Sequence, residues 1–227
     1  MTTSFTNDAF EVVVAQLGIG LSAVREAAAV LSENELKRAD SFIFDRDRNR
    51  YVAARARLRR LIGARLGIRP EAVEFHYGSN GKPALERRPL SEDLRFNIAH
   101  CEDVAVYALS YGREIGVDVE AICDLPDSDR VAKHCFSAFE NKEYSCLNEK
   151  HKPEGFFNCW TRKEAFVKAL GDGLSYPLSH FDVSLAPDRP AEILRVGNIP
   201  GDRCGWEIYS FKPRPGFVGA VVIEGLS

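Results

Sequence analysis

Ile115-Gly116-Val117-Asp118-Val119-Glu120 is a stretch in which apolar residues alternate with glycine or acidic residues. This period of two predicts a half-buried β-strand. Side chains two positions apart on a strand share a face, so Asp118 and Glu120 are expected to point the same way. Two neighbouring carboxylates repel and raise each other's proton affinity unless a cation compensates. The strand therefore presents a candidate cation site.

A second acidic motif lies further along, in Trp160-Thr161-Arg162-Lys163-Glu164-Ala165-Phe166-Val167-Lys168. We expect a helix from about Pro153 to Leu170, ended by Gly171-Asp172-Gly173, on which Glu164 and Lys168 stand one turn apart on one face. Either motif alone has an ordinary explanation, as a solvated strand edge or a solvated helix salt bridge. Together, three carboxylates on rigid elements and a lysine can form a magnesium site that handles a phosphate ester.

At these residues the chain resembles the 4'-phosphopantetheinyl transferase family, in its long, surfactin-activating (Sfp-type) branch. That family is marked by a Gly-Val/Ile-Asp segment and, after a spacer, Trp/Phe-x-x-Lys-Glu-Ala/Ser-x-x-Lys, and every fixed position is matched here. Gly81-Lys82-Pro83 and Phe96-Asn97-Ile98-Ala99-His100 match two further blocks in the family's order. The similarity extends loosely from Ser32 to Ser184. The short, trimeric branch is disfavoured, because it carries its aspartate motif near the N-terminus.

The resemblance implies transfer of 4'-phosphopantetheine from coenzyme A to a serine of an apo acyl, peptidyl or aryl carrier protein, with release of adenosine 3',5'-bisphosphate. Mg²⁺ held by Asp118, Glu120 and Glu164 would bridge the pyrophosphate and neutralise charge on the leaving group. Glu164, or a metal-bound water that it orients, would take the serine proton. Lys168 would stabilise the phosphates as charge develops. The expected catalytic residues are Asp118, Glu164 and Lys168.

Basic residues supply the coenzyme A contacts that the resemblance implies. By register with the family, Arg50 corresponds to a residue that grips the adenosine 3'-phosphate, and Arg38 falls at another basic position. Guanidinium forks suit phosphate oxygens. Lys82 in its glycine-rich turn and His100 at the end of a strand are further expected phosphate contacts, and Lys168 completes this set.

One family position is altered, because this chain has Ala99-His100 where the family normally carries Ser-His. The change removes one hydroxyl donor near the phosphates. A hydrogen bond to a charged group contributes about 1.5–3 kcal/mol, so we expect weaker coenzyme A binding unless a neighbour substitutes.

Secondary-structure signals in the rest of the chain predict an α+β protein. Ser32-Glu33-Asn34-Glu35 and the pair Ser137 and Glu140 are typical of capping boxes that begin helices. A long helix is expected from Arg48 to Leu66, stopped by Gly67, with most of its arginines on the solvent face. Strands are expected at 96–100, 104–109, 181–185, 206–211 and 217–223.

Both halves of the chain thus contain strands and a long helix. The resemblance adds that they form two similar lobes, a pseudo-dimer in which each lobe is a small antiparallel sheet packed with a long helix. We expect an N-terminal lobe over 1–112 with the coenzyme A-binding residues, and a C-terminal lobe over 113–227 with the magnesium and catalytic motifs. The active site would lie at the lobe interface. Part of the carrier-docking surface is implied between Ala121 and Pro153.

Composition agrees with a cytoplasmic enzyme. The 227 residues carry a net charge of −3, which disfavours nucleic acid or a membrane surface as the main partner. No apolar run of about eighteen residues occurs, and acidic residues precede the short apolar run 12–17 where a secretory signal would be basic. The six cysteines contain no Cys-x-x-Cys pair and are expected to be reduced, apolar fillers. The resemblance implies a monomer.

Two other functions remain open at this point. A magnesium-dependent phosphohydrolase of a nucleotide or coenzyme A would use the same carboxylates with water as acceptor. A non-catalytic carrier-binding or coenzyme A-binding module would need no such carboxylate set. Fatty-acid, polyketide and nonribosomal-peptide synthases all remain possible sources of the carrier.

Overall fold

The first half of the chain forms a lobe in which an antiparallel sheet packs on a long helix. The computed structural model describes residues 2–78, 81–86, 93–171, 176–197 and 205–226. The helices of this lobe are α1 (Leu21–Ala28), α2 (Glu33–Asp40) and α3 (Asp45–Leu66), with a 3-10 turn η1 (Pro70–Ala72). Its strands are β1 (Thr2–Thr6), β2 (Phe10–Gln16), β3 (Phe75–Tyr77), β4 (Pro83–Leu85), β5 (Leu94–Cys101) and β6 (Val104–Tyr111). The sheet has the order β1-β2-β6-β5, and β3 pairs with β4 in a separate hairpin.

The second half repeats this arrangement. Its helices are α4 (Ser128–Cys135), α5 (Ala138–Ser145) and α6 (Lys152–Leu170), with a 3-10 turn η3 (Leu178–His180). Its strands are β7 (Ile115–Ala121), β8 (Phe181–Val183), β9 (Ile193–Val196), β10 (Trp206–Phe211) and β11 (Phe217–Glu224). The antiparallel sheet has the order β10-β11-β7, and β8 pairs with β9. The expected α+β class and the two similar lobes are confirmed.

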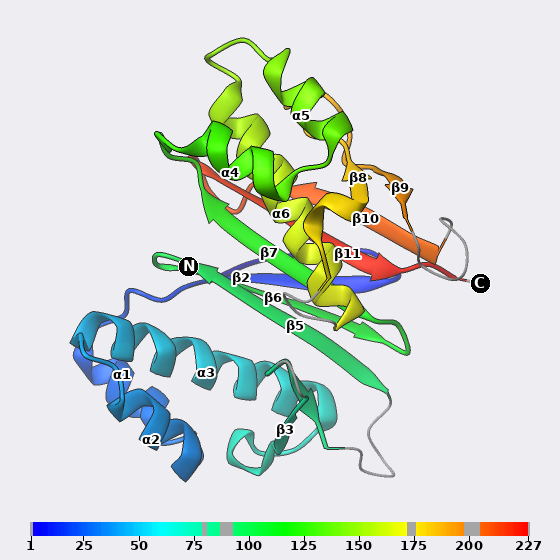
Figure 1. The fold of residues 1–227 in the computed structure, drawn as a ribbon. Coiled ribbons are helices and arrows are strands. Elements are labelled where there is room, and N and C mark those ends of the chain that lie inside the picture. Colours follow the sequence, from blue (N-terminus) through cyan, green and yellow to red (C-terminus); the bar gives the residue numbers. More distant parts are fainter. Residues whose placement is uncertain (1, 79–80, 87–92, 172–175, 198–204, 227) are drawn as a thin grey trace.

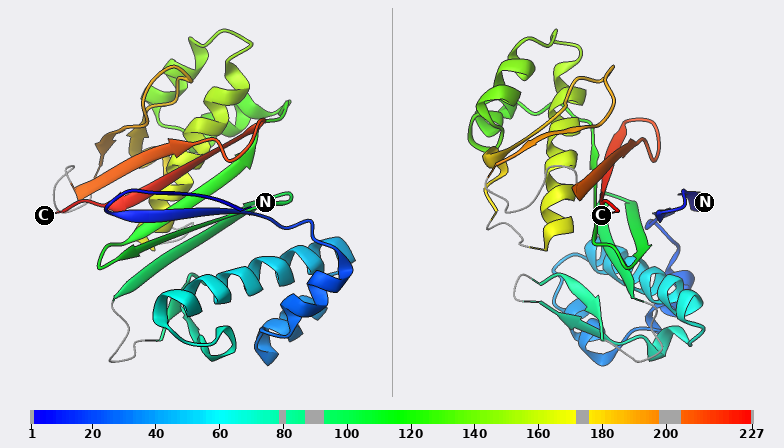
Figure 2. Two further views of the ribbon diagram at one scale, coloured as in Figure 1. Left: turned by 180° about the vertical axis from the view of Figure 1, so that it is seen from behind. Right: turned by 90° about the vertical axis from the view of Figure 1, so that its right-hand side faces the viewer.

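The two sheets adjoin at the centre of the molecule, with α1–α3 at one end and α4 and α5 at the other, while α6 lies across β7 and β11, as Figure 1 and Figure 2 show. Strands β5 and β6 pack against β7. Between the sheets lies an apolar cluster whose members include Val12, Val106, Val117 and Val221, all fully buried. Because the lobes share an apolar core, the residues that each lobe contributes to their boundary are held in a fixed relation.

The predicted helix boundaries are largely confirmed. Both capping boxes are present, Ser32 with Glu35 and Ser137 with Glu140. Helix α3 begins at Asp45, earlier than predicted, and ends at Gly67, whose φ of 64° places it in the left-handed region. Helix α6 ends in the same way at Gly171, with a φ of 80°. The predicted continuation of this stop, Asp172-Gly173, lies outside the described residues.

One expectation about burial is wrong, and the expectation for the arginines of α3 holds with two exceptions. Arg55 and Arg59 do not lie on the solvent face of α3 but are 7% and 3% exposed. The reason is Glu35, which supplies a buried carboxylate for both guanidinium groups. Strand β7 is not half-buried either, since it is covered on both faces from Ile115 to Val119. The cover on its acidic face comes from α6.

Gly116 explains how α6 approaches β7 so closely. A Cβ atom at this position would lie 2.9 Å from the Cα of Ala169 and closer still to backbone atoms of Ala165 and Ala169. Backbone atoms cannot move aside as a flexible side chain can, so we expect Gly116→Ala to lower the free energy of unfolding by about 2–3 kcal/mol. Urea denaturation followed by circular dichroism measures this. Gly20→Ala is the control, because nothing lies near the Cβ that it would add.

None of the helices in the described ranges is long and apolar enough to cross a membrane. The cysteines in those ranges are all unpaired, as their dispersed spacing predicts, but only Cys159 is buried as the expected apolar filler, and Cys123 and Cys146 are exposed. The remaining one, Cys204, lies outside the described residues.

Candidate active site

Asp118 is a buried carboxylate at the boundary of the two lobes. It lies on β7 and is 5% exposed. Its Oδ1 accepts a hydrogen bond of 2.5 Å from Nζ of Lys168, whereas its buried Oδ2 has no hydrogen-bond partner in the protein. Burial raises the pKa of Asp118 above its ordinary value, and the Lys168 ammonium opposes this rise. An unpartnered carboxylate oxygen in such a position is suited to a further cation.

The negative charge of Asp118 acts on two further carboxylates, Glu120 and Glu164. Burial, followed by repulsion from Asp118, raises the pKa of Glu120 and also that of Glu164. Lys168 opposes the shift at both sites. Glu164 and Lys168 come from one face of α6, one turn apart, as the sequence predicts. The structure therefore places the three predicted carboxylates within electrostatic range of one lysine, which contacts Asp118 directly.

These carboxylates suit a magnesium ion that is also bound by substrate oxygens. They suit less well an ion whose ligands all come from the protein. In the described part of the chain, no group of three or more His, Cys, Asp or Glu side chains is arranged to hold a metal ion. Mg²⁺ is usually bound by one or two carboxylates, several waters and the oxygens of substrate phosphates. The free Oδ2 of Asp118 meets that need, with Glu120 and Glu164 as neighbouring donors.

Side chains of β5 hydrogen-bond to the backbone of β7, the strand that carries Asp118 and Glu120. The side-chain oxygen of Asn97 accepts a 3.0 Å hydrogen bond from the backbone N–H of Val117. Four residues along β5, Sγ of Cys101 accepts one of 3.4 Å from the N–H of Ala121 and also hydrogen-bonds to Glu120. The sequence did not predict these roles, although Asn97 stands in a family block. Burial raises the pKa of Cys101 to about 11, which argues against a nucleophilic thiol.

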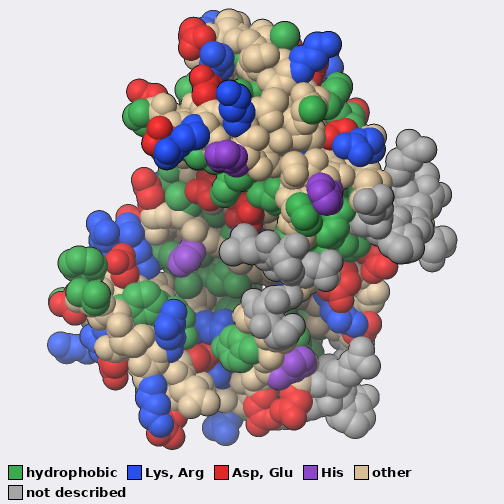
Figure 3. Space-filling model, viewed as in Figure 1, with side chains coloured by type: hydrophobic (Ala, Val, Ile, Leu, Met, Phe, Trp, Pro, Cys, Tyr) green, Lys and Arg blue, Asp and Glu red, His purple; other side chains and the backbone are tan. Residues whose placement is uncertain are grey.

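A cleft leads from the N-terminal lobe to Lys168. Its larger part, a cavity of about 780 Å³, is lined by Arg38, Tyr51 and Tyr77 among others. A smaller cavity of about 210 Å³ is lined by both Lys82 and Lys168. The two cavities share Gly81, Pro83 and Ile98 as lining residues, so they adjoin. Figure 3 shows a hollow between the lobes on this face, with acidic side chains above it and basic side chains below. The combined space is within the range of small-molecule sites.

The predicted coenzyme A contacts fall into two groups. Arg38, Lys82 and Lys168 line the cleft. Arg50 forms an ion pair of 2.7 Å with Asp103 in the turn that follows His100, so these two predicted contacts lie near each other at one end of β5. Arg50 and His100 are not among the described residues that line the two cavities.

Ala99 lies in the apolar core rather than among these expected phosphate contacts. It is 6% exposed and belongs to the apolar cluster between the sheets. The expected loss of coenzyme A affinity from the missing hydroxyl stays a prediction.

A buried ion cluster supports the wall of the larger cavity. Glu35 accepts hydrogen bonds of 2.8 Å from Nε of Arg55 and 2.6 Å from Nε of Arg59. Arg55 lies over the ring of Phe75 and hydrogen-bonds to Tyr77. Arg59 also donates to the carbonyl oxygens of Pro70 and Val73, so the cluster fixes η1 and β3 against α3.

Glu35 should make the stability of this lobe sensitive to acid. Burial alone raises its pKa, but hydrogen bonds from Ser32 and Arg59 and the charges of both arginines outweigh burial and leave the pKa below its ordinary value of 4.5. A lowered native-state pKa contributes stability above the unfolded-state value, which is lost as pH falls through the native one. We therefore expect the difference in melting temperature between the wild type and Glu35→Gln to shrink below about pH 4.5. A constant difference from pH 7 to pH 3 would contradict this.

Comparison with known proteins covers most of the chain. A family model described as "4'-phosphopantetheinyl transferase superfamily" matches residues 114–221. Another, described as "4'-phosphopantetheinyl transferase, N-terminal", matches residues 21–111. The second match ends and the first begins where β6 gives way to β7.

Individual relatives carry the same activity in their names. The chain is 35% identical over 204 residues to the 4'-phosphopantetheinyl transferase HetI of Nostoc sp., covering 90% of this chain and 83% of that protein. It is 31% identical over 163 residues to the 4'-phosphopantetheinyl transferase of Bacillus subtilis, covering 70% and 69%. It is 27% identical over 172 residues to the L-aminoadipate-semialdehyde dehydrogenase-phosphopantetheinyl transferase of Rattus norvegicus, covering 71% and 55%.

Proposed function

Because the chain belongs to the 4'-phosphopantetheinyl transferase superfamily, we propose that it transfers the 4'-phosphopantetheine moiety of coenzyme A to a serine of an apo carrier protein. The observation that carries the site assignment is the buried Asp118, whose Oδ2 has no protein partner while Oδ1 binds Lys168. This carboxylate stands beside Glu120 and Glu164 at the end of a cleft that Lys82 and Lys168 line. A phosphate ester and a cation are the ligands that such a set suits.

The chain fits the long, surfactin-activating branch within this superfamily. An N-terminal lobe over 1–112 would hold the nucleotide part of coenzyme A, and a C-terminal lobe over 113–227 would supply the carboxylates. The cleft that crosses from Arg38 to Lys168 supports this division. The carrier would be an acyl, peptidyl or aryl carrier domain, met by a cytoplasmic, monomeric enzyme.

Glu164 would act as the base. The serine Oγ forms a bond to the β-phosphorus of coenzyme A, and the bond between that phosphorus and the bridging oxygen breaks. Adenosine 3',5'-bisphosphate leaves with the electron pair, and the serine proton passes to Glu164. A serine hydroxyl is a poor nucleophile at neutral pH, and the raised pKa of Glu164 brings it closer to the value that suits a general base there.

Lys168 and Asp118 would organise the reacting phosphates. The Lys168 ammonium, oriented by Asp118, stabilises the negative charge that develops on the phosphate oxygens. Mg²⁺ at the free Oδ2 of Asp118, with Glu120 and Glu164 as neighbouring carboxylates, would supply further positive charge to the pyrophosphate. Arg38 would meet a phosphate in the larger cavity, and Arg50 and His100 would meet the 3'-phosphate at its margin.

The test is intact-mass spectrometry of apo carrier proteins incubated with this protein, coenzyme A and Mg²⁺. The panel contains carriers from fatty-acid, polyketide and nonribosomal-peptide synthases. We expect one carrier class to gain a single phosphopantetheine on its serine, and the gain to disappear with a chelator. Consumption of coenzyme A without any modified carrier would instead indicate a phosphohydrolase. No consumption and no modified carrier would leave a binding module.

A further inference from the structure

The ammonium group of Lys82 connects the N-terminal lobe to the end of α6. Its Nζ donates to the carbonyl oxygen of Lys168 at 2.7 Å and to that of Ala169 at 3.5 Å. A third contact of 3.4 Å reaches Oε2 of Glu114. An ammonium has three N–H donors, so these three acceptors use all of them. A phosphate of coenzyme A can therefore bind Lys82 only if one of these contacts is released.

The last turn of α6 needs such a partner. The final carbonyl groups of a helix receive no hydrogen bond from N–H groups of the same helix, and they form its negative end. Lys82 supplies both a donor and a positive charge there. One of the two carbonyls belongs to Lys168, whose own Nζ bonds to Asp118 at 2.5 Å. The position of the Lys168 backbone, and with it the reach of its side chain, is thus held from the opposite lobe.

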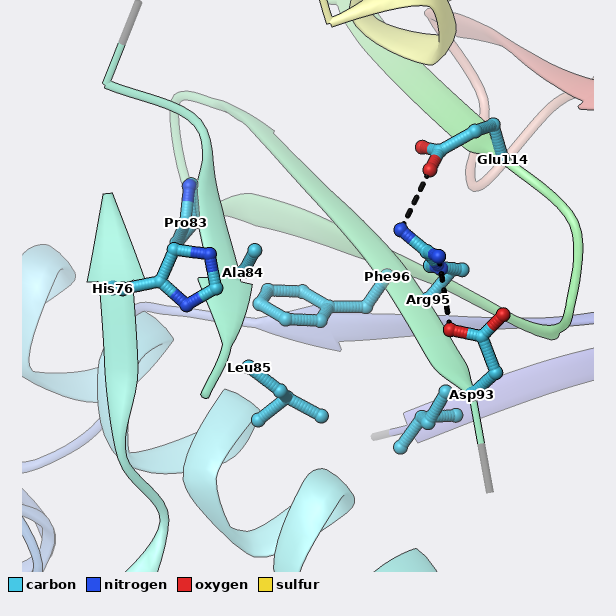
Figure 4. A pocket seen from close by; sticks show the side chains of 9 residues that line it. His76, Pro83, Ala84, Leu85, Asp93, Arg95, Phe96 and Glu114 are labelled. Carbon is cyan, nitrogen blue, oxygen red and sulfur yellow. Dashed lines mark hydrogen bonds and ion pairs between the residues drawn. The ribbon is translucent and has the colours of Figure 1, made fainter. Parts of the chain in front are cut away.

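Glu114 stands behind this contact. It lies immediately before β7, and its two oxygens are shared between Lys82 and Arg95, with Nη1 of Arg95 at 2.8 Å. Arg95 also pairs with Asp93 at 2.9 Å. Figure 4 shows Arg95 between these two carboxylates, at the edge of a separate cavity of about 180 Å³ that His76 and Phe96 also line. Burial lowers the pKa of Lys82, and the charge of Glu114 opposes this fall.

We propose that Glu114 is a positioning residue for the transfer reaction, acting through Lys82 and the last turn of α6 on Lys168. The proposal rests on the proposed function and goes beyond it, because Glu114 lies outside the expected catalytic, metal and coenzyme A residues. Lys82 has a role in this arrangement that differs from a phosphate contact. Its contribution is to hold the helix that carries Glu164 and Lys168.

The variants are Glu114→Gln and the matched control Asp93→Asn. Both remove the charge of a carboxylate that pairs with Arg95, but only Glu114 touches Lys82. We expect Glu114→Gln to lower kcat by about fivefold with little change in the KM for coenzyme A, a size typical of indirect coupling. Asp93→Asn should behave as the wild type. Lys82→Met should lower kcat further, and adding Glu114→Gln to it should have no additional effect, since the two residues act as one unit.

A second readout does not depend on catalysis. Hydrogen exchange measured by mass spectrometry should be faster in the last turn of α6 in Glu114→Gln than in Asp93→Asn, while melting temperatures stay equal. Equal exchange and equal kcat in the two variants would overturn the proposal. So would a raised KM for coenzyme A with kcat unchanged, which would make the pair a coenzyme A contact. If the wild type modifies no carrier, the proposed function fails and so does the role of Glu114 in it, while the exchange comparison shows whether the contact with α6 exists.

Discussion

Glu164→Gln should reduce phosphopantetheine transfer by about a thousandfold, in the range expected for loss of a general base. Glutamine keeps the size of the side chain and one acceptor oxygen, but it cannot take the proton from the carrier serine. Glu164 is half-buried on α6, and Asp118 and Lys168 are the charged groups that act on its pKa. Loss of its negative charge should leave the fold intact. The rate is measured by intact-mass spectrometry of the carrier at saturating coenzyme A and Mg²⁺.

Glu154→Gln is the matched control for this experiment. Glu154 lies on the same helix, in its first turn, and pairs with Lys212 rather than with the candidate site. Its replacement should leave transfer unchanged. Asp118→Ala should reduce transfer at least as much as Glu164→Gln, because it removes the carboxylate that orients Lys168. Near-normal turnover by a well-folded Glu164→Gln protein would remove the assignment of Glu164 as the base.

The carboxylate part of the candidate site could be predicted from sequence because it follows local rules. Alternation fixes the strand that carries Asp118 and Glu120, and helical spacing fixes the face shared by Glu164 and Lys168. Contacts between distant segments follow no such rule. Lys82 is separated from Lys168 and Ala169 by 86 and 87 residues, and nothing in a Gly-Lys-Pro turn indicates that its lysine binds the end of a helix.

Burial of charge is hard to predict from the sequence for a related reason. Arg55 and Arg59 have the spacing of a wet helix face, and only the arrival of Glu35 from α2 makes their burial possible. In the same way, nothing in the motif around Glu164 predicts a buried position for Lys163. The structure places it in the core, against Glu140 of α5.

Lys163→Met should lower the free energy of unfolding by about 3–5 kcal/mol, the largest stability effect that we expect, because it leaves a buried carboxylate without its cation. Lys163 and Glu140 are both fully buried and are joined by a contact of 2.7 Å. Nζ of Lys163 also donates to the carbonyl oxygens of Leu178 and Phe181. Glu140 accepts from the backbone N–H of Ser137 and Val183. The pair thus joins α5, α6, η3 and β8.

Two further measurements test whether the unpaired charge of Glu140 is what destabilises Lys163→Met. Glu140→Gln in the Lys163→Met background should restore part of the stability, because a neutral amide can still accept from the backbone without leaving an unpaired charge.

Lys163→Met alone should become more stable as pH falls from about 7 to 5. Burial already raises the pKa of Glu140 in the wild type, and without Lys163 the native state gains still more from protonation, so stability falls as pH rises. Lys37→Met is the control, because Lys37 and Glu33 form an exposed pair whose loss should change neither stability nor its pH dependence. If Lys163→Met were as pH-insensitive as that control, the buried charge would not be the cause of its instability, and loss of the two carbonyl contacts would explain it instead.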